Sequence, residues 1–289
     1  MMLGSVLVTG ATGTFGRHFI RRLLDEGLSE RRCVFSRGEH TQAEFRAEMN
    51  DDERLRWFIG DVRDLSRLRR AMNGVSVVVH AAALKRIEVG HENPIEMVRT
   101  NIDGAINVIE ASQDAGVKKV VALSTDKAYE PASAYGHSKA MMESLMLAAN
   151  NTVGAYGPRY AVTRYGNIWS ASGSVVPKWR AMIERGARAV PVTDPDATRF
   201  YMTADQACTL VLETIMHMQG GELAVPDLPA YRVGDLAEAM GALTSVTGLP
   251  VWEKKHETMA PGKCSANAPR LSVDDLRGLL GLNERRVAA

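Results

Sequence analysis

Short valine-rich apolar runs alternate along this 289-residue chain with segments whose apolar positions recur at helical spacing. The apolar runs predict strands at residues 6–9, 32–35, 55–59, 75–80, 117–123 and 160–165. The segments between them predict helices at residues 14–26, 42–49, 65–72 and 94–115, and from residue 135 to about 150. This alternation is typical of a parallel sheet that helices cover on both faces. We therefore predict an α/β fold with a Rossmann-like, doubly wound parallel sheet.

The alternation weakens beyond about residue 175, where prolines divide the chain into short pieces. These prolines are Pro191, Pro195, Pro226, Pro229, Pro250, Pro261 and Pro269. We predict a main domain over residues 1–175 and a small C-terminal lobe formed mainly by residues 176–289. A helix over residues 204–218 is a candidate for packing back on the sheet.

The chain carries 35 basic and 34 acidic residues, so its net charge favours neither nucleic acid nor an anionic membrane as a partner. Hydrophobic residues make up 45% of the chain, enough for a substantial core. Its cysteines, Cys33, Cys208 and Cys264, match no metal-binding spacing, and their odd number argues against a disulfide framework. The apolar run at residues 6–9 is too short for a signal peptide, and no run reaches the length of a membrane span. We expect a cytoplasmic protein without a bound metal ion.

Ligands of open parallel sheets bind beyond the carboxyl ends of the strands. In this chain Gly10, Asp61, Ala81, Thr125 and Gly166 each follow a predicted strand. We therefore expect these residues to line one site, although they are scattered along the sequence.

A glycine-rich turn connects the first predicted strand to the first predicted helix. Gly10 permits the tight turn, Gly13 lets the backbone approach a pyrophosphate, and Gly16 allows close packing of the helix on the strand. The start of the helix adds amide donors and a favourable dipole. The turn predicts a dinucleotide site whose binding residues are Gly10, Thr12, Gly13, Thr14, Phe15 and Gly16.

Cofactor preference is expected at the end of the second strand, where an NAD site usually places a carboxylate. This chain has Ser36 and Arg37 there, and a hydroxyl with a guanidinium suits the 2′-phosphate of NADP. We therefore predict NADP as the cofactor; a solvated loop arginine is the alternative interpretation of Arg37. The residues expected to complete the cofactor site are Asp61 and Val62 beside the adenine, and Ala81, Ala82 and Ala83 as a wall of small side chains.

Two candidate acid–base pairs follow the fifth predicted strand. Tyr135 and Lys139 are four residues apart in a predicted helix, so they lie on one face of it. A phenol ionises with a pKa near 10, and a close ammonium would lower that pKa towards neutrality. Asp126 and Lys127 form the second pair, beside Thr125; a surface turn with a weak ion pair is the alternative interpretation. A redox pair next to a proton-transfer pair indicates chemistry beyond a simple oxidation.

The glycine pattern, Asp61, the alanine run, and Tyr135 with Lys139 resemble the extended short-chain dehydrogenase/reductase family. More narrowly, the chain resembles inverting UDP-N-acetylglucosamine 4,6-dehydratases of the polysaccharide biosynthesis protein family over about residues 5–215. The segments that carry this resemblance are Ala81-Ala82-Ala83-Leu84-Lys85, Asn93-Pro94, Thr125-Asp126-Lys127-Ala128, Arg164-Tyr165-Gly166-Asn167, Gly173-Ser174-Val175-Val176-Pro177 and Thr198-Arg199-Phe200. Retaining sugar dehydratases carry Asp-Glu where this chain has Asp126-Lys127, and this difference points towards inversion.

The resemblance implies a catalytic role for each member of the two pairs, with Thr125 beside them. Tyr135, as a phenolate, removes the proton of the hydroxyl at sugar carbon 4 while NADP+ oxidises that carbon. Lys139 lowers the pKa of the tyrosine and holds the nicotinamide ribose. Lys127, as a neutral amine, takes the proton of carbon 5, and Asp126 protonates the departing hydroxyl at carbon 6. Hydride then returns to carbon 6, so NADP is regenerated in each turnover.

The resemblance also implies a nucleotide-sugar substrate, which we expect to be UDP-linked. The residues expected to contact it are Lys85, Asn167, Val175 and Arg199. The polar residues also have plainer interpretations. Lys85 could be a solvated lysine, Asn167 a turn cap and Arg199 a member of a structural ion pair. Family members usually carry Arg-Pro-Gly-Glu-Lys near the nucleotide, whereas this chain has Ala260-Pro261-Gly262-Lys263. Arg270 is a candidate for the missing phosphate contact.

Other functions remain open from the sequence. A nucleotide-sugar 5,6-dehydratase or an epimerase would use the same opening oxidation, and a non-catalytic NADP-binding regulator would keep the glycine turn. Retention of both acid–base pairs argues against the regulator. The helix face with Met141, Met142, Leu145 and Met146 is expected to pack in the core or at a subunit interface. The corresponding helix often forms dimers in the superfamily that the chain resembles, so the resemblance implies a homo-oligomer, a dimer or larger.

Overall fold

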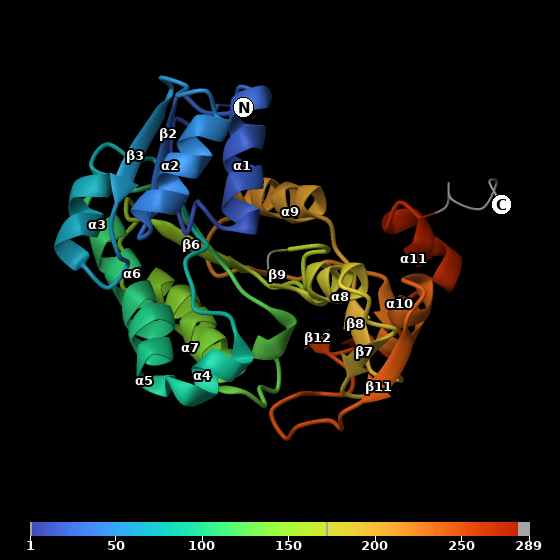
Figure 1. Ribbon diagram of the computed structural model, residues 1–289. Coiled ribbons are helices and arrows are strands. Elements are labelled where there is room, and N and C mark those ends of the chain that lie inside the picture. The colour runs from blue at the N-terminus through green and yellow to red at the C-terminus, as the bar shows by residue number, and fades with distance from the viewer. Residues whose placement is uncertain (1, 172, 283–289) are drawn as a thin grey trace. The chain divides into compact units, whose positions relative to one another are not determined.

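The computed structural model describes residues 2–171 and 173–282 (Figure 1). The chain divides into two compact units, Met1–Arg164 with Ala204–Val225, and Tyr165–Thr203 with Pro226–Ala289. The chain thus leaves the first unit after Arg164, ahead of the boundary expected at residue 175, and returns to it at Ala204. No helix among the described residues is long and apolar enough to cross a membrane.

The first unit is built on a seven-stranded parallel sheet with the strand order β3-β2-β1-β4-β5-β6-β9. Its strands are β1 (Ser5–Thr9), β2 (Arg31–Ser36), β3 (Leu55–Ile59), β4 (Val77–His80), β5 (Lys119–Leu123), β6 (Arg159–Thr163) and β9 (Leu223–Ala224). This confirms the predicted Rossmann-like, doubly wound sheet. The apolar pattern missed β9, because this strand has only two residues, which pair with Val162 and Thr163.

Helices cover both faces of this sheet (Figure 1). Figure 1 shows α1 (Thr14–Asp25), α2 (Glu39–Glu48) and α9 (Ala204–His217) on one side. On the other side lie α3 (Leu65–Met72), α6 (Gly104–Asp114) and α7 (Ala134–Ala148). The short helices are α4 (Ile87–Glu92), α5 (Pro94–Met97), and the 3-10 turns Asp126–Ala128 and Ala149–Asn151. The helix α9 packs against α1, β5 and β6, so it belongs to the sheet of the first unit.

The prediction of one continuous helix over residues 94–115 was wrong in one respect. A π-helical segment, Val98–Asp103, interrupts it between α5 and α6. Two contacts explain the interruption. The Asn101 side chain bonds the backbone of Leu84, outside the helix. Gly104 lies so close to Val62 that a Cβ atom at this position would be 2.7 Å from its side chain. Apolar periodicity shows which face of a helix is buried, but it does not register this change in the hydrogen-bond pattern.

The second unit has small sheets and a core of its own. Its strand pairs are β7 (Ala189–Val192) with β11 (Leu243–Val246), β8 (Thr198–Phe200) with β10 (Ala230–Arg232), and β12 (Thr258–Ala260) with β13 (Lys263–Cys264). Its helices are α8 (Val175–Glu184), α10 (Val233–Ala239) and α11 (Val273–Leu279). Trp179, Tyr231 and Leu236 are buried at the centre of this core. These strands pair only with one another in two-stranded sheets, in keeping with the prolines of this region.

Candidate active site

The glycine-rich turn has the shape that a dinucleotide phosphate requires. Gly10 has a positive φ of 66°, and a Cβ atom there would lie 2.8 Å from the backbone of Ala82. A Cβ atom on Gly16 would lie 2.5 Å from the Cα of Ala11, so α1 packs on β1 only because residue 16 is glycine. Gly13 caps α1 with extended backbone and without any side-chain hydrogen bond, so the first amides of the helix face the turn. These features fit a bound pyrophosphate.

The other predicted residues of this turn contribute backbone. Arg17 Nε donates to the Thr12 carbonyl at 3.0 Å and holds the turn against the helix. The ring of Phe15 is buried and stacks on Phe19 with 5.3 Å between centroids, so only its backbone is placed to meet a phosphate. The Thr14 carbonyl bonds the His18 ring at 2.8 Å, which is an ordinary contact within the first turns of α1.

A buried hydrogen-bond chain ties the end of β1 to the end of β4. The Ala82 amide donates to Thr9 Oγ1 at 3.2 Å, and this oxygen lies 2.8 Å from His80 Nδ1. Burial lowers the pKa of His80 to about 3, so the ring is neutral. The chain brings Ala81 and Ala82 against the glycine-rich turn, as expected for a wall of small residues.

The end of β2 carries the residues predicted to read the cofactor. Gln42 Nε2 donates to the Ser36 carbonyl at 2.9 Å, to Ser36 Oγ at 3.0 Å and to the Phe58 carbonyl at 2.8 Å. The Arg37 side chain is 51% exposed, and its guanidinium lies 3.6 Å from Asp61 Oδ2. Ser36 is therefore fixed between β2 and β3, whereas Arg37 extends into solvent beside one carboxylate.

Asp61 and Val62, the residues predicted to lie beside the adenine, both make contacts within the protein. Arg63 donates from Nε and from a terminal nitrogen to Asp61 Oδ2, at 3.0 and 2.7 Å. Burial alone would raise the pKa of Asp61, but the hydrogen bonds from Arg63 hold it below its ordinary value. The Val62 side chain is buried in the core, and its carbonyl accepts from Asn107 at 2.9 Å. Only the Asp61 carboxylate is thus partly accessible.

The two predicted acid–base pairs lie in one cluster, in which Asp126 and Lys139 are buried and Lys127 and Tyr135 are partly buried. Thr125 Oγ1 donates to Asp126 Oδ1 at 2.9 Å, and Lys127 Nζ lies 3.0 Å from the same oxygen. The Asp126 side chain is fully buried and that of Lys127 is 15% exposed. Both charges act on the phenol of Tyr135, which also shares a hydrogen bond with the Thr125 hydroxyl. The 3-10 turn after β5 therefore faces the start of α7.

The electrostatics of Tyr135 differ from the sequence expectation in a specific way. Burial raises the pKa of Tyr135 to about 12, and Asp126 adds to this, whereas Lys127 and the Thr125 hydroxyl lower it. The cation that acts on the phenol is thus Lys127 rather than Lys139. Lys139 Nζ instead donates to the Leu123 carbonyl, and burial lowers the pKa of Lys139 to about 8. The phenolate expected at neutral pH is not favoured by these residues alone.

Sequence reasoning missed the residues that hold α7 in place. Asn101 accepts from the Leu84 amide at 2.8 Å and donates to the Leu84 carbonyl and to Ser138 Oγ, both at 2.9 Å. Ser138 in turn donates to the Tyr135 carbonyl at 2.8 Å. The available signal was an asparagine within an otherwise amphipathic segment, which is compatible with a buried polar partner.

A second missed group lies behind Lys139. Glu143 of α7 accepts from Ser124 at the end of β5 and from Arg164, the residue that follows β6. All three side chains are buried. The signal was again present in the sequence, because Glu143 falls one turn after Lys139 and Arg164 is a charged residue within an apolar predicted strand, residues 160–165.

The predicted substrate residues fall in both units. Lys85 is exposed in the loop after β4 of the first unit, whereas Asn167, Val175 and Arg199 belong to the second. Asn167 is exposed, and Val175 is the first residue of α8. Arg199 is 8% exposed and donates to the carbonyls of Thr198 and Lys255 at 2.8 and 3.1 Å. Its guanidinium also pairs with Glu253, which favours the structural ion pair over a phosphate contact.

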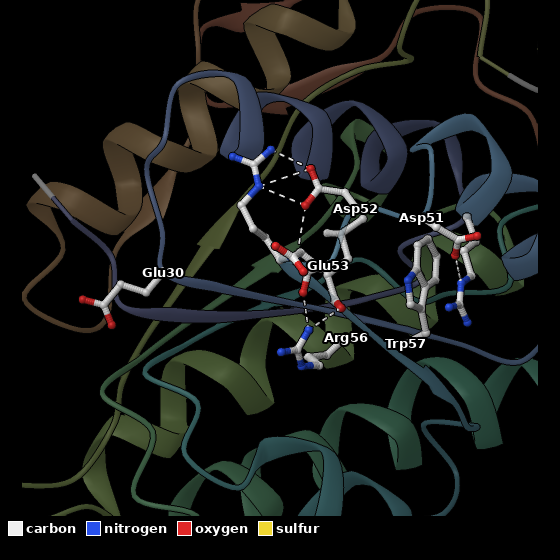
Figure 2. Close-up of a pocket in the computed structure, with 9 residues that line it drawn as sticks. Glu30, Asp51, Asp52, Glu53, Arg56 and Trp57 are labelled. Atoms are coloured by element: carbon white, nitrogen blue, oxygen red, sulfur yellow. Dashed lines mark hydrogen bonds and ion pairs between the residues drawn. The ribbon is translucent and has the colours of Figure 1, made fainter.

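A polar hollow at the amino ends of β2 and β3 is a second place to consider (Figure 2). Charged side chains of this hollow pair with one another: Arg54 pairs with Asp52 at 2.6 Å, and Arg46 pairs with Asp51. Ligands of parallel sheets bind at the opposite, carboxyl ends of the strands. We therefore assign this hollow a structural role. Within residues 2–171 and 173–282, no group of three or more His, Cys, Asp or Glu side chains could hold a metal ion.

Comparison with known proteins agrees with this geometry. UDP-N-acetylglucosamine 4,6-dehydratase (inverting) of Campylobacter jejuni subsp. jejuni is 42% identical over 257 residues, which cover 88% of this chain and 77% of that protein. UDP-glucose 4-epimerase of Rickettsia conorii is 36% identical over 283 residues, covering 94% of this chain and 81% of the relative. The crystal structure of Pen from Bacillus thuringiensis superposes with a TM-score of 0.91 at 31% identity, over 96% of this chain and 98% of Pen.

The profile of one protein family, described as polysaccharide biosynthesis protein, matches residues 6–269. This match spans both units and includes the glycine-rich turn, the two acid–base pairs and Arg199. The resemblance stated from the sequence is thereby confirmed: the chain belongs to the polysaccharide biosynthesis protein family.

Proposed function

We propose that this protein is a nucleotide-sugar 4,6-dehydratase that acts on UDP-N-acetylglucosamine and inverts carbon 5. The observation that carries the proposal is the meeting of the buried Asp126 with the partly buried Lys127 and Tyr135 in one cluster. A dehydratase must oxidise the sugar and then eliminate water, so it needs a redox base and a separate acid–base pair within reach of one ring. The 42% identical relative from Campylobacter jejuni carries this activity in its name.

The cofactor in this proposal is NADP. Gly10, Gly13 and the first amides of α1 would hold the pyrophosphate, and Ser36 with Arg37 would hold the 2′-phosphate. When bound, the nicotinamide supplies reversible hydride transfer, and its positive charge in the oxidised form favours the ionised phenol. This positive charge matters because the pKa of Tyr135 is raised to about 12, chiefly by burial, when only the protein's own residues act on it.

Tyr135 is proposed to take the proton from the hydroxyl at carbon 4, and Lys139 to bind the nicotinamide ribose. The Asp126–Lys127 pair performs the elimination. Transfer of one proton across the 3.0 Å between Lys127 Nζ and Asp126 Oδ1 gives a neutral amine and a carboxylic acid. The total charge of the pair does not change, and burial favours the uncharged form. The pair then has both the base for the proton on carbon 5 and the acid for the hydroxyl leaving carbon 6.

The test is incubation with UDP-N-acetylglucosamine in deuterated water, followed by mass spectrometry and NMR. We expect a 4-keto-6-deoxy product, lighter than the substrate by one water before isotope uptake, with deuterium at an inverted carbon 5. An exocyclic alkene would identify a 5,6-dehydratase instead. An unchanged sugar mass with an altered carbon 4 would identify an epimerase, the activity named for the 36% identical Rickettsia relative.

We also propose that the protein forms a homo-oligomer through α7 and the segments beside it. Met142 and Met146 are fully buried, but Met141 on the same helix is 50% exposed. Ile95 and Val98, on elements that pack against α7, are 66% and 45% exposed. Exposed apolar side chains on neighbouring elements favour a subunit contact. Met141→Lys should lower the mass measured by light scattering, and an unchanged mass would reject this surface.

A further inference from the structure

A buried group of charged and polar residues lies behind Lys139, on the side of α7 that faces the sheet. Its members are Glu143, which is 5% exposed, Arg164, which is 8% exposed, and Ser124, which is 7% exposed. Lys139 itself is 4% exposed. Buried charges are costly unless they are paired and hydrogen-bonded, so this arrangement requires a reason.

The Glu143 carboxylate is held from two strands. Arg164 Nε donates to Oε1 at 2.9 Å, and a terminal nitrogen of the same guanidinium donates to Oε2, which makes the pair bidentate. Ser124 Oγ donates to Oε1 as well. The guanidinium carbon of Arg164 also lies 5.7 Å from the ring centre of Tyr129. The carboxylate is therefore fixed in position by donors at the ends of β5 and β6.

Glu143 is placed to act on Lys139. The two residues are four apart in α7, so their side chains leave the helix on the same face. Lys139 Nζ donates to the carbonyl of Leu123, the residue directly before Ser124. The ammonium and the carboxylate therefore share the space at the end of β5.

The charges around Lys139 come from each element packed on this part of α7. His80 of β4 is neutral, and Asp126 with Lys127 forms an ion pair without net charge. Arg164 adds a positive charge and Glu143 a negative one. Burial lowers the pKa of Lys139 to about 8, and Glu143 acts against this effect.

We propose that Glu143, fixed by Arg164 and Ser124, is a positioning residue that keeps Lys139 protonated and its ammonium directed at the end of β5. The functional part of this inference rests on the proposed dehydratase, in which a charged Lys139 binds the cofactor ribose. In this proposal Arg164 keeps the proton on Lys139 rather than on Glu143. A lone buried carboxylate beside an amine can accept the proton of that amine, whereas a bidentate guanidinium, which stays charged, disfavours the protonated carboxyl.

The direct test measures the ionisation of Lys139 without substrate. In protein labelled with 13C-lysine, the Cε resonance of Lys139 is identified by its loss in Lys139→Arg and followed over pH. Glu143→Gln keeps the size of the side chain but removes its charge, and should lower the titration midpoint by about one pH unit or more. The matched control is Glu213→Gln, an exposed carboxylate on α9, which should leave the midpoint unchanged. An equal midpoint in Glu143→Gln and the native protein would overturn the proposal.

If Glu143→Gln does not fold, Glu143→Asp tests the same point, because the shorter side chain keeps the negative charge but places it farther from Lys139. A smaller decrease of the midpoint supports the proposal, and an unchanged or higher midpoint overturns it. A pH profile of kcat/KM separates the two proposals. In Glu143→Gln, the alkaline limb of this profile should shift to lower pH by the same amount as the titration midpoint of Lys139. A shifted midpoint in a protein without dehydratase activity would reject the proposed function alone, whereas an active enzyme with an unshifted limb would reject the role of Glu143.

Discussion

The Lys127 carbonyl lies directly against Gly136: a Cβ atom at residue 136 would be 2.4 Å from that oxygen. This close approach brings the 3-10 turn Asp126–Ala128 against the first turn of α7. It therefore places the proposed elimination pair beside Tyr135, which directly precedes this glycine.

Gly136→Ala should disrupt this arrangement. The added methyl group must push α7 away from the turn, and overpacking of this kind costs about 1–3 kcal/mol of unfolding free energy. A displacement of the catalytic groups by about 1 Å can lower kcat by about 100-fold. Chemical denaturation and steady-state kinetics measure the two effects. Gly154→Ala is the matched control, because nothing lies within 4 Å of a Cβ atom at that exposed position. Equal kcat values for both variants would contradict the importance of this contact.

Lys127→Ala separates cofactor binding from elimination. The variant loses the proposed base for carbon 5, so dehydration should fall by about 100-fold or more while NADP binding stays unchanged. Exchange of the carbon 5 hydrogen with deuterated water, followed by NMR, should disappear as well. Lys118→Ala, which removes an exposed lysine just before β5, is the control and should behave as the native protein. Undiminished dehydration by Lys127→Ala would reject Lys127 as the base.

Much of the fold followed from the sequence, because strands buried on both faces must be apolar throughout. Thus β1 and β5, which are almost entirely buried, were predicted within two residues of their observed ends. The two-residue strand β9 was missed because two residues carry no pattern. The π-helical segment Val98–Asp103 was missed because it depends on a side chain, Asn101, that bonds a distant loop.

The location of the candidate site also followed from the sequence, since the carboxyl ends of parallel strands meet at one edge. The hydrogen-bond and charge partners of the long side chains could not be predicted from the sequence. Spacing of four residues puts Tyr135 and Lys139 on one face of α7, but a lysine has four rotatable bonds. Lys139 turns to the Leu123 carbonyl, and Lys127 supplies the charge at the phenol. Burial, which decides the pKa of Tyr135, depends on contacts far apart in sequence.

Arg37→Ala tests the proposed preference for NADP. A hydrogen bond to a charged group contributes about 1.5–3 kcal/mol, so the affinity for NADP should fall by about 10- to 100-fold. The affinity for NAD, which lacks the 2′-phosphate, should change little. Isothermal titration calorimetry with both cofactors measures the difference. Arg70→Ala, at an exposed position of α3, controls for the loss of one positive charge. Equal losses for both cofactors would show that Arg37 does not read the 2′-phosphate.

The buried ammonium of Lys139 should make stability depend on pH in a defined direction. Its pKa is about 8 in the folded protein and 10.5 as the ordinary value. Between these values the unfolded chain binds more protons than the folded one, so the free energy of unfolding should rise with pH from about 8 to 10.5. Below pH 8 the buried charge of Lys139 lowers the free energy of unfolding by the full amount that corresponds to the pKa difference, which is about 3 kcal/mol. Lys139→Met should therefore stabilise the protein at pH 7, less the lost hydrogen bond to Leu123, and remove this part of the pH dependence. Denaturant unfolding of both proteins at several pH values measures the effect, and parallel curves would contradict the lowered pKa.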